Sequence, residues 1–384
     1  MEKIEVKLAD RPYEVFVKRG LLSDEGPEGG VARVMELAAG NRIAFVSDDN
    51  VWKAGGSDFF EALRSAAGGG ADGGAGQGPF AVVVPPGGKN KNFQEFGRLL
   101  GAFAEAGMDR DGLVVSMGGG VVGNLAGFAA ATWMRGVRHA QIPTSLLAMV
   151  DSSVGGKVGV DIPAGKNLAG AFHQPSLVLV DPDCLLTLPG RELRSGMAEV
   201  IKYGAIESES LFERLEGIKT GGGVPMALFS NVIADCIGIK AEIVAKDEFD
   251  RDKQGVLKFG HTFGNAIGAK YGFEKYTHGE AVAMGMLIAA RYGEAIGVTE
   301  HGTAERLGGL LGRWGLDQGE TADGLVELIR RDNKSKGDTA RLVLLNHIGS
   351  AGLFRTKLSG LEAGLLALSG LAGAPEAGDP PGDK

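Results

Sequence analysis

The chain has 384 residues, of which 44% are hydrophobic and 23% charged, and its formal net charge is −8. This length and balance predict a soluble globular protein with two domains of ordinary size. The negative charge argues against a general nucleic-acid binder, which needs a basic surface, although a local group of lysines can still bind a small anion. Two cysteines, Cys184 and Cys236, are too few for a disulfide framework.

The N-terminal segment and the apolar runs predict a cytoplasmic protein. Residues 1–20 alternate charged with apolar side chains and contain no signal-peptide core. The apolar runs are all shorter than the ~20 residues that span a bilayer. We therefore expect a cytoplasmic location with no membrane partner and no nucleic-acid partner.

The first half of the chain alternates β-rich runs with helical stretches. The predicted strands are NRIAFVSD (41–48), FAVVVPPG (80–87), DGLVVSMGGG (111–120), RHAQIPTS (138–145) and SLVLVDPD (176–183). Several are apolar on both faces, which is typical of a parallel sheet buried between two helix layers. Between the first two runs lies a glycine-rich segment at 66–79, which we expect to be a flexible surface insertion.

After Asp183 nearly every segment has helical periodicity, with helices predicted near 191–206, 226–247 and 279–297. We therefore predict an α/β fold followed by an all-α part. The expected boundaries are a Rossmann-like parallel-sheet domain at 1–182, a helical domain at 183–370 and a disordered Pro/Gly/Asp-rich tail at 371–384.

A glycine-rich turn at Gly118–Gly120 follows a predicted strand and precedes a predicted helix. Backbone N–H groups in such a turn can approach a pyrophosphate at the helix N-terminus, although glycines that merely pack a strand against a helix give the same pattern. Asp48 ends another predicted strand, where a carboxylate can bind ribose hydroxyls. Residues 144–157, which follow a third predicted strand, contain hydroxyl side chains, an aspartate and a lysine. Three polar strand ends favour a dinucleotide site.

Glu199 lies three residues before Lys202, so both side chains would share one face of a helix. His261 and His278 each stand beside a glycine at the edge of a helical stretch. One carboxylate and two imidazoles suit zinc or cobalt with open positions for a substrate, but lone histidines more often cap helices or fill cores. From spacing alone both interpretations stay open.

Several lysines occur near these groups. Lys157 and Lys166 lie in glycine-rich loops, Lys202 lies one turn from a candidate metal ligand, and Lys240 lies in a later helix. A single lysine is usually a solvated surface charge. Clustered, they are what a doubly anionic substrate requires.

From about Asp48 to Ile348 the sequence resembles the 3-dehydroquinate synthase family of the sugar phosphate cyclase superfamily. The motifs that carry the resemblance are GGGVVGN, MRG, QIPTSLLAMVDSSVGGK, GKN, TLPGRELRSGMAEVIKYG, GHTFGN and HGEAVAMGM, in that order. The resemblance implies an NAD-binding first domain and a metal-binding helical second domain. The related iron-dependent alcohol and glycerol dehydrogenases share this architecture. Lys157 and Lys202 favour the cyclase family over these dehydrogenases.

The resemblance also implies roles for individual residues. The implied metal ligands are Glu199, His261 and His278. The implied NAD contacts are Asp48, Asn50, Lys91, Gly118, Gly119, Gly120, Asn124, Thr144, Ser145, Asp151, Ser152, Lys166 and Thr187. The implied substrate contacts are Arg135, Lys157, Lys166, Asn167, Lys202, Lys240, Gln254, Lys258 and Lys334. Lys157, Lys202, Lys240 and Asn265 are the implied catalytic residues. Arg135 resembles an arginine that reaches a neighbouring subunit's substrate, which implies a homodimer.

The implied reaction converts 3-deoxy-D-arabino-heptulosonate 7-phosphate, a phosphorylated sugar acid, to 3-dehydroquinate and phosphate in the shikimate pathway. It proceeds by transient oxidation with NAD, phosphate elimination and an intramolecular aldol closure, assisted by zinc or cobalt.

This chain departs from the family pattern around His261 and at two upstream positions. Gln254 replaces an arginine that holds the substrate carboxylate, Lys258 replaces an asparagine, and Asn265 replaces a histidine. Gly88 and Asn124 stand where glutamate and aspartate are usual. Losing an arginine–carboxylate pair costs about 2–5 kcal/mol if the carboxylate stays desolvated, and Lys258 could restore the charge without the bidentate geometry.

These departures leave three hypotheses for function. The first is a working 3-dehydroquinate synthase. The second is another cyclase of the superfamily, acting on sedoheptulose 7-phosphate or glucose 6-phosphate. The third is a non-catalytic NAD-binding relative.

Overall fold

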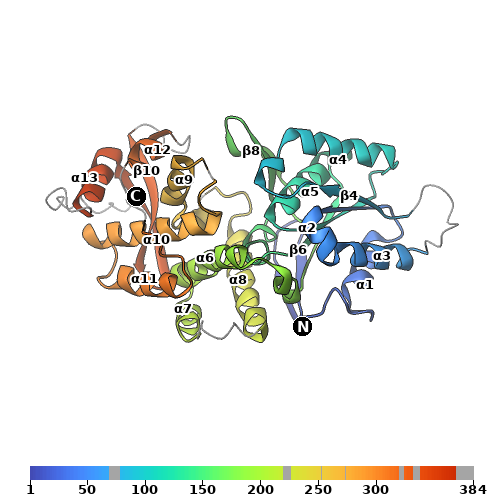
Figure 1. Ribbon diagram of the computed structural model, residues 1–384, viewed down its shortest axis with the longest axis horizontal. Coiled ribbons are helices and arrows are strands. Elements are labelled where there is room, and N and C mark those ends of the chain that lie inside the picture. The colour runs from blue at the N-terminus through green and yellow to red at the C-terminus, as the bar shows by residue number, and fades with distance from the viewer. Residues whose placement is uncertain are drawn as a thin grey trace. The chain divides into compact units, whose positions relative to one another are not determined.

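A computed structural model describes residues 1–68, 78–218, 226–251, 253–272, 274–319, 324–331 and 338–368. Most of the expected insertion at 66–79, the whole expected tail at 371–384 and Lys334 lie outside these residues. The chain divides into two compact units (Figure 1), Met1–Pro189 with Pro225–Phe249, and Gly190–Val224 with Asp250–Lys384.

The first unit is built on a seven-stranded sheet in the order β1-β2-β9-β6-β5-β3-β4. The strands are β1 (Glu2–Val6), β2 (Tyr13–Val17), β3 (Ile43–Asp48), β4 (Phe80–Val84), β5 (Leu113–Gly118), β6 (Arg138–Pro143) and β9 (Leu177–Val180). Every neighbouring pair from β2 to β4 in this order is parallel, and the pair β1–β2 is antiparallel. The five predicted strands are therefore confirmed, while β1 and β2 were not predicted.

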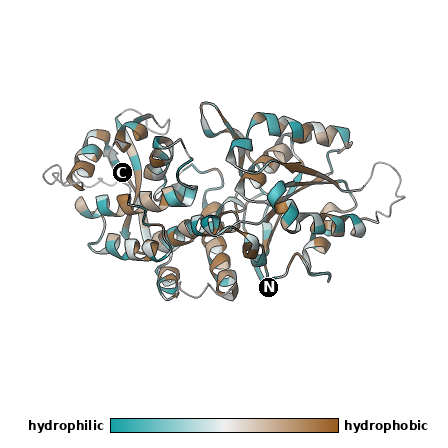
Figure 2. Ribbon diagram, viewed as in Figure 1, coloured by the Kyte–Doolittle hydropathy of each residue, from teal (hydrophilic) through white to brown (hydrophobic). Residues whose placement is uncertain are grey.

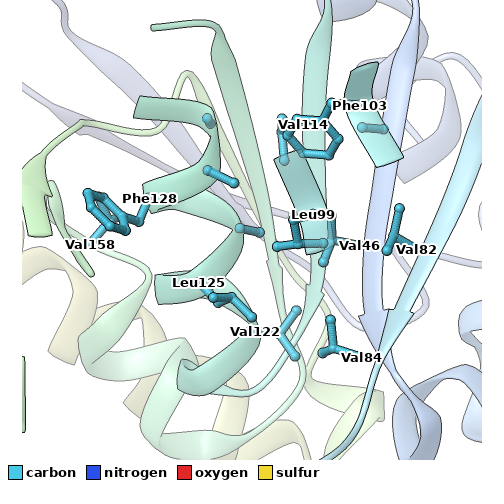
Figure 3. Close-up of a cluster of buried hydrophobic side chains, with 14 of the residues drawn as sticks. Val46, Val82, Val84, Leu99, Phe103, Val114, Val122, Leu125, Phe128 and Val158 are labelled. Atoms are coloured by element: carbon cyan, nitrogen blue, oxygen red, sulfur yellow. The ribbon is translucent and has the colours of Figure 1, made fainter. Parts of the chain in front are cut away.

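Both faces of the central strands of this sheet are buried, as the two-sided apolar pattern predicts. Along β3, Ala44 and Val46 face one core and Ile43 and Phe45 face the other. The first core lies under α4 (Phe93–Glu105) and α5 (Gly120–Thr132), as Figure 3 shows. The second lies under α1 (Gly30–Ala38) and α3 (Ser57–Ala66). Several central strands of this sheet are accordingly coloured as hydrophobic in Figure 2.

Residues 225–249 were expected in the second domain, but their contacts place them in the first unit. They form α8 (Met226–Lys246), which packs against β1, β2 and two short helices, η4 (Ala148–Ser152) and η5 (Pro182–Thr187). The sequence reveals that α8 is apolar, but not which unit covers it. A hairpin of β7 (Lys157–Ile162) and β8 (Gly165–Phe172) completes the first unit beside α5.

The second unit is mostly helical, as predicted, and α10 (His278–Ala295) lies at its centre. The other helices are α6 (Gly190–Glu207), α7 (Glu209–Glu216), η7 (Lys253–Lys258), α9 (His261–Lys270), α11 (Thr303–Arg313), α12 (Leu325–Arg331) and α13 (Leu358–Leu368). An antiparallel pair, β10 (Thr339–His347) and β11 (Ser350–Lys357), was not predicted. α10 packs against α6, α9, α11, α13 and β10, which explains why it is apolar nearly all round. Among the described residues, no helix is both long and apolar enough to cross a bilayer.

Glycines allow α9 and α10 to approach each other at backbone distance. A Cβ on Gly285 would lie 2.1 Å from the Gly260 carbonyl oxygen and 2.6 Å from the Gly264 nitrogen. Gly260 itself has φ +77°, a conformation that favours glycine, and it directly precedes His261. The position of His261 therefore depends on the lack of a side chain at Gly260 and at Gly285.

We predict that Gly285→Ala lowers the free energy of unfolding by about 1–3 kcal/mol or more, because the added methyl group must push α9 from α10. Urea denaturation measures this effect. Gly309→Ala is the matched control, since it lies in an exposed part of α11 where an added Cβ meets nothing within 4 Å. The control should gain about 0.5–1 kcal/mol. A Gly285→Ala protein as stable as the wild type would contradict this packing.

Candidate functional site

The residues expected to bind a nucleotide follow the C-terminal ends of the parallel strands. Asp48 ends β3 and Asn50 follows it, Lys91 follows β4, and Gly118 ends β5 before Gly119, Gly120 and Asn124. Thr144, Ser145, Asp151 and Ser152 follow β6, and Thr187 follows β9. Because these strands are parallel, all of these groups lie at one edge of the sheet.

The strand order reverses between β3 and β5. From β3 the chain goes to β4 on one side, and then to β5, β6 and β9 on the other. In open α/β sheets, ligands bind in the crevice at such a switch point. Asp48 and the Gly118–Gly120 turn end the two strands that flank it.

The glycine turn leads into α5, whose N-cap Gly119 provides no side-chain cap. A Cβ on Gly119 would lie 3.5 Å from Ser145 Oγ, and one on Gly120 would lie 3.0 Å from Ser152 Oγ. The expected glycines and hydroxyls therefore lie together. First-turn amides without a side-chain cap, beside hydroxyl groups, form a suitable site for a phosphate group.

Three of the expected nucleotide residues also have local structural roles. Asp48 Oδ1 accepts hydrogen bonds from the backbone of Asn50 (2.9 Å) and Val51 (3.1 Å) and so caps α2 (Asp49–Val51). Asn124 Nδ2 donates to the Gly120 carbonyl at 2.8 Å, and the exposed Thr187 donates to the Cys184 carbonyl at 3.2 Å. These contacts fix side chains whose roles toward a nucleotide remain predictions.

The tip of the β7–β8 hairpin is tied to the segment after β4. Lys91, buried at 7% exposure, donates to Asn167 Oδ1 and lies 3.5 Å from Asp161. Asp161 Oδ1 also accepts from the Asn167 backbone at 2.8 Å, and its charge opposes the fall that burial causes in the Lys166 pKa. Asp161, which interacts with the expected residues Lys91, Lys166 and Asn167, was not predicted from the sequence.

The remaining expected residues of the first unit lie on α8, at the start of β7 and after α5. Lys240 on α8 is buried and donates to Asp151 at both its carboxylate (2.8 Å) and its carbonyl. Lys157 is exposed at the start of β7. Arg135 is exposed with φ +70°, next to Met134 at φ +45°.

The three expected metal ligands lie together in the second unit. Glu199 on α6 is fully buried, and His261 and His278 are the first residues of α9 and α10. His278 Nε2 lies 3.1 Å and His261 Nε2 lies 3.6 Å from Glu199 Oε1, and one ligand atom from each residue lies within 4.8 Å of the others. This donor set of one oxygen and two nitrogens fits a zinc or cobalt ion with an open coordination position.

A backbone contact orients the His261 ring, and burial favours its neutral form. Nδ1 lies 3.1 Å from the Phe259 carbonyl, so the tautomer that donates there directs the lone pair of Nε2 toward Glu199. Burial is the main cause that lowers the His261 pKa, to about 4. At neutral pH the imidazole can therefore bind a cation without first losing a proton.

Lys202 shares the buried face of α6 with Glu199. Its Nζ lies 2.5 Å from Glu199 Oε2, and the two side chains are 1% and 0% exposed. The prediction that the i,i+3 spacing brings them together is confirmed. A bound cation would therefore share the Glu199 carboxylate with the lysine.

The positions that depart from the family pattern have distinct surroundings. Gln254 is buried at 4% exposure in η7, and Asn265 lies one turn after His261 on α9. Lys258 Nζ lies 2.9 Å from Asp250 Oδ2. Because that carboxylate offsets its charge, Lys258 supplies less positive potential than its sequence position alone suggests.

Sequence reasoning also missed residues that connect α6 to the start of α10. Arg191 binds Glu280 through two hydrogen bonds, and Ser195 accepts one from the Gly279 backbone. One signal was available, because Thr277-x-x-Glu280 before an apolar run is the pattern of a capping box, and the structure contains that capping box.

Residues 81–195 match the family model for the 3-dehydroquinate synthase N-terminal region, and residues 196–335 match that for its C-terminal region. A 3-dehydroquinate synthase of Clostridium acetobutylicum is 40% identical over 352 residues, which are 91% of this chain and 95% of the relative. The chain belongs to the 3-dehydroquinate synthase family.

Solved structures show the same fold at lower identity. A 2-deoxy-scyllo-inosose synthase complexed with carbaglucose-6-phosphate, NAD+ and Co2+ has a TM-score of 0.80 at 22% identity, covering 95% of this chain and 99% of that one. A 2-epi-5-epi-valiolone synthase from Streptomyces hygroscopicus subsp. jinggangensis, with NAD+ and Zn2+ bound, has a TM-score of 0.78 at 24% identity, with coverage of 95% and 98%. The predicted fold class is confirmed.

We predict that Glu199→Gln destabilises the metal-free protein by about 3–5 kcal/mol, because it leaves the Lys202 charge buried without its carboxylate. Denaturation of protein treated with a chelator measures this. Glu61→Gln is the matched control, since Arg64–Glu61 has the same spacing at 3.1 Å but is 45% and 61% exposed. The control should change stability by less than about 1 kcal/mol. Equal effects for the two variants would contradict the importance of burial here.

Proposed function

We propose that this chain converts 3-deoxy-D-arabino-heptulosonate 7-phosphate to 3-dehydroquinate and phosphate, as a phosphate-eliminating carbon–oxygen lyase. The observation that carries the proposal is its 40% identity, over 91% of the chain, to a curated 3-dehydroquinate synthase. The fold alone would not support it, because one fold serves many reactions. The grouping of Glu199, His261 and His278 adds a site that suits the chemistry.

We further propose NAD and a zinc or cobalt ion as cofactors. NAD would accept a hydride transiently, and the metal would polarise the alcohol that is oxidised. Glu199, His261 and His278 would hold the metal, and the glycine turn before α5 would receive the pyrophosphate at the switch point of the sheet. Co2+, Zn2+ and NAD+ in the solved structures of similar fold agree with this assignment.

The basic residues would bind and orient the anionic substrate. We propose this role for the expected lysines and for Arg135, Asn167 and Gln254, with Lys157, Lys202, Lys240 and Asn265 closest to the chemistry. Lys240 is held by Asp151 and Lys202 by Glu199, so both ammonium groups are fixed before a substrate arrives. Fixed charges reduce the reorganisation that neutralising a phosphate or carboxylate requires. A homodimer completed by Arg135 and a cytoplasmic location remain predictions.

We predict that the purified protein with NAD and Co2+ releases phosphate from the heptulosonate phosphate in step with 3-dehydroquinate, without net formation of NADH. Phosphate and NADH can be followed by absorbance in the same reaction. Chelator-treated protein should be inactive until Co2+ or Zn2+ is added. If metal is shown to be bound and neither product forms, the proposal is wrong.

The same assay separates the other hypotheses. Turnover of sedoheptulose 7-phosphate or glucose 6-phosphate, but not of the heptulosonate, would indicate a different cyclase, in keeping with the changes at positions 254, 258 and 265. A protein that binds NAD but no metal, and acts on none of the three, would indicate a non-catalytic relative.

A further inference from the structure

One face of α6 makes three successive contacts with the first turn of α10. Arg191, Ser195 and Glu199 follow each other at intervals of four residues, so their side chains align along the helix. They contact Glu280, Gly279 and His278 in turn. This row of three side chains ends with Glu199 at the proposed metal site and begins with Arg191, two helical turns away.

The contact furthest from Glu199 is the strongest of the three by geometry. Arg191 Nε donates to Glu280 Oε1 at 3.0 Å and Nη2 donates to Oε2 at 2.8 Å, which is a bidentate pair. Arg191 Nη2 also donates to the Lys275 carbonyl at 2.7 Å, just before α10. The Glu280 side chain is 4% exposed and that of Arg191 is 50% exposed.

The middle contact brings the two backbones together. Ser195 Oγ accepts from the Gly279 nitrogen at 3.0 Å, and a Cβ on Gly279 would lie 1.9 Å from the Ser195 carbonyl oxygen. Glu280 also closes the capping box, accepting from the Thr277 nitrogen at 2.8 Å. His278 lies between Thr277 and Gly279, so both of its neighbours in sequence are held.

From this arrangement we infer that Arg191 is a positioning residue for the metal site, which it serves by fixing the first turn of α10 and with it His278. The inference rests on the metal site proposed above. Metal–ligand distances tolerate shifts of only about 0.2 Å, so small movements of that turn matter. Without Arg191 the buried Glu280 carboxylate would lose its guanidinium and turn toward water, moving the segment that carries His278.

Simple electrostatics predicts the opposite result. Removing a positive charge near a cation site, while leaving Glu280 in place, should strengthen cation binding. A weaker affinity in Arg191→Ala therefore distinguishes positioning from a change in local charge.

The test is a Co2+ titration of the full chain, with the dissociation constant set by a metal buffer and the visible absorption of the cobalt complex as readout. We expect Arg191→Ala to weaken binding about 10–100-fold and to alter the spectrum. Arg191→Lys should be intermediate, because an ammonium cannot replace both bonds of the fork. Ser195→Ala, which removes the acceptor for Gly279, should weaken binding about threefold to tenfold and serves if Arg191→Ala does not fold.

Arg306→Ala is the matched control within the same unit. Arg306 forms a similar bidentate pair with Glu216, at 3.1 and 2.9 Å. We expect its Co2+ affinity to stay within about twofold of the wild type. Wild-type affinity in a folded Arg191→Ala, or an equal loss in Arg306→Ala, would overturn the inference. If Arg191→Ala does not fold, wild-type affinity in both Arg191→Lys and Ser195→Ala would overturn it. A wild-type protein that binds no Co2+ would instead overturn the proposed metal site, and the inference with it.

Discussion

Glu199 is a carboxylate with no exposed surface, and a buried charge of this kind is stable only when cations and hydrogen-bond donors surround it. Lys202 contacts one of its oxygens, and the two histidines approach the other. The fold must therefore bring an ammonium group and two imidazoles close to this carboxylate inside the second unit. α6 carries Glu199 and Lys202, and α9 and α10 carry the two histidines.

Glycines allow the helices that carry these groups to pack closely together. Both histidines occupy the first position of a helix, and each adjoins a glycine whose Cβ would collide with a neighbouring helix. Gly260 allows α10 to pack beside His261, and Gly279 allows α6 to pack beside His278. Close backbone approach fixes where each histidine leaves its helix, so the ligand positions are set by helix packing as well as by side-chain contacts. In the first unit, Gly120 at the start of α5 similarly leaves room for Ser152, whose Oγ would lie 3.0 Å from an added Cβ.

Much of this organisation could be predicted from sequence, because it depends on local pattern. Two-sided apolar runs revealed the five parallel strands, and the three-residue spacing revealed the contact of Glu199 with Lys202. Local pattern did not predict long-range contacts, and the grouping of Glu199 with His261 and His278 was implied only by the family resemblance. Nothing local assigns the apolar helix α8 to the first unit, pairs Arg191 with Glu280, or places Asp161 against Lys91. The Lys258–Asp250 pair likewise changes the meaning of a substitution that sequence alone suggests is compensating.

The metal centre connects the packing of the second unit to the proposed chemistry. Anomalous X-ray diffraction at the zinc edge, from crystals grown with Zn2+, tests it most directly. We predict one strong peak per chain, about 2.0–2.2 Å from a Glu199 carboxylate oxygen and from Nε2 of both His261 and His278. Zinc bound at another position, or a peak that lacks either histidine, would contradict the assembly of this site by α6, α9 and α10.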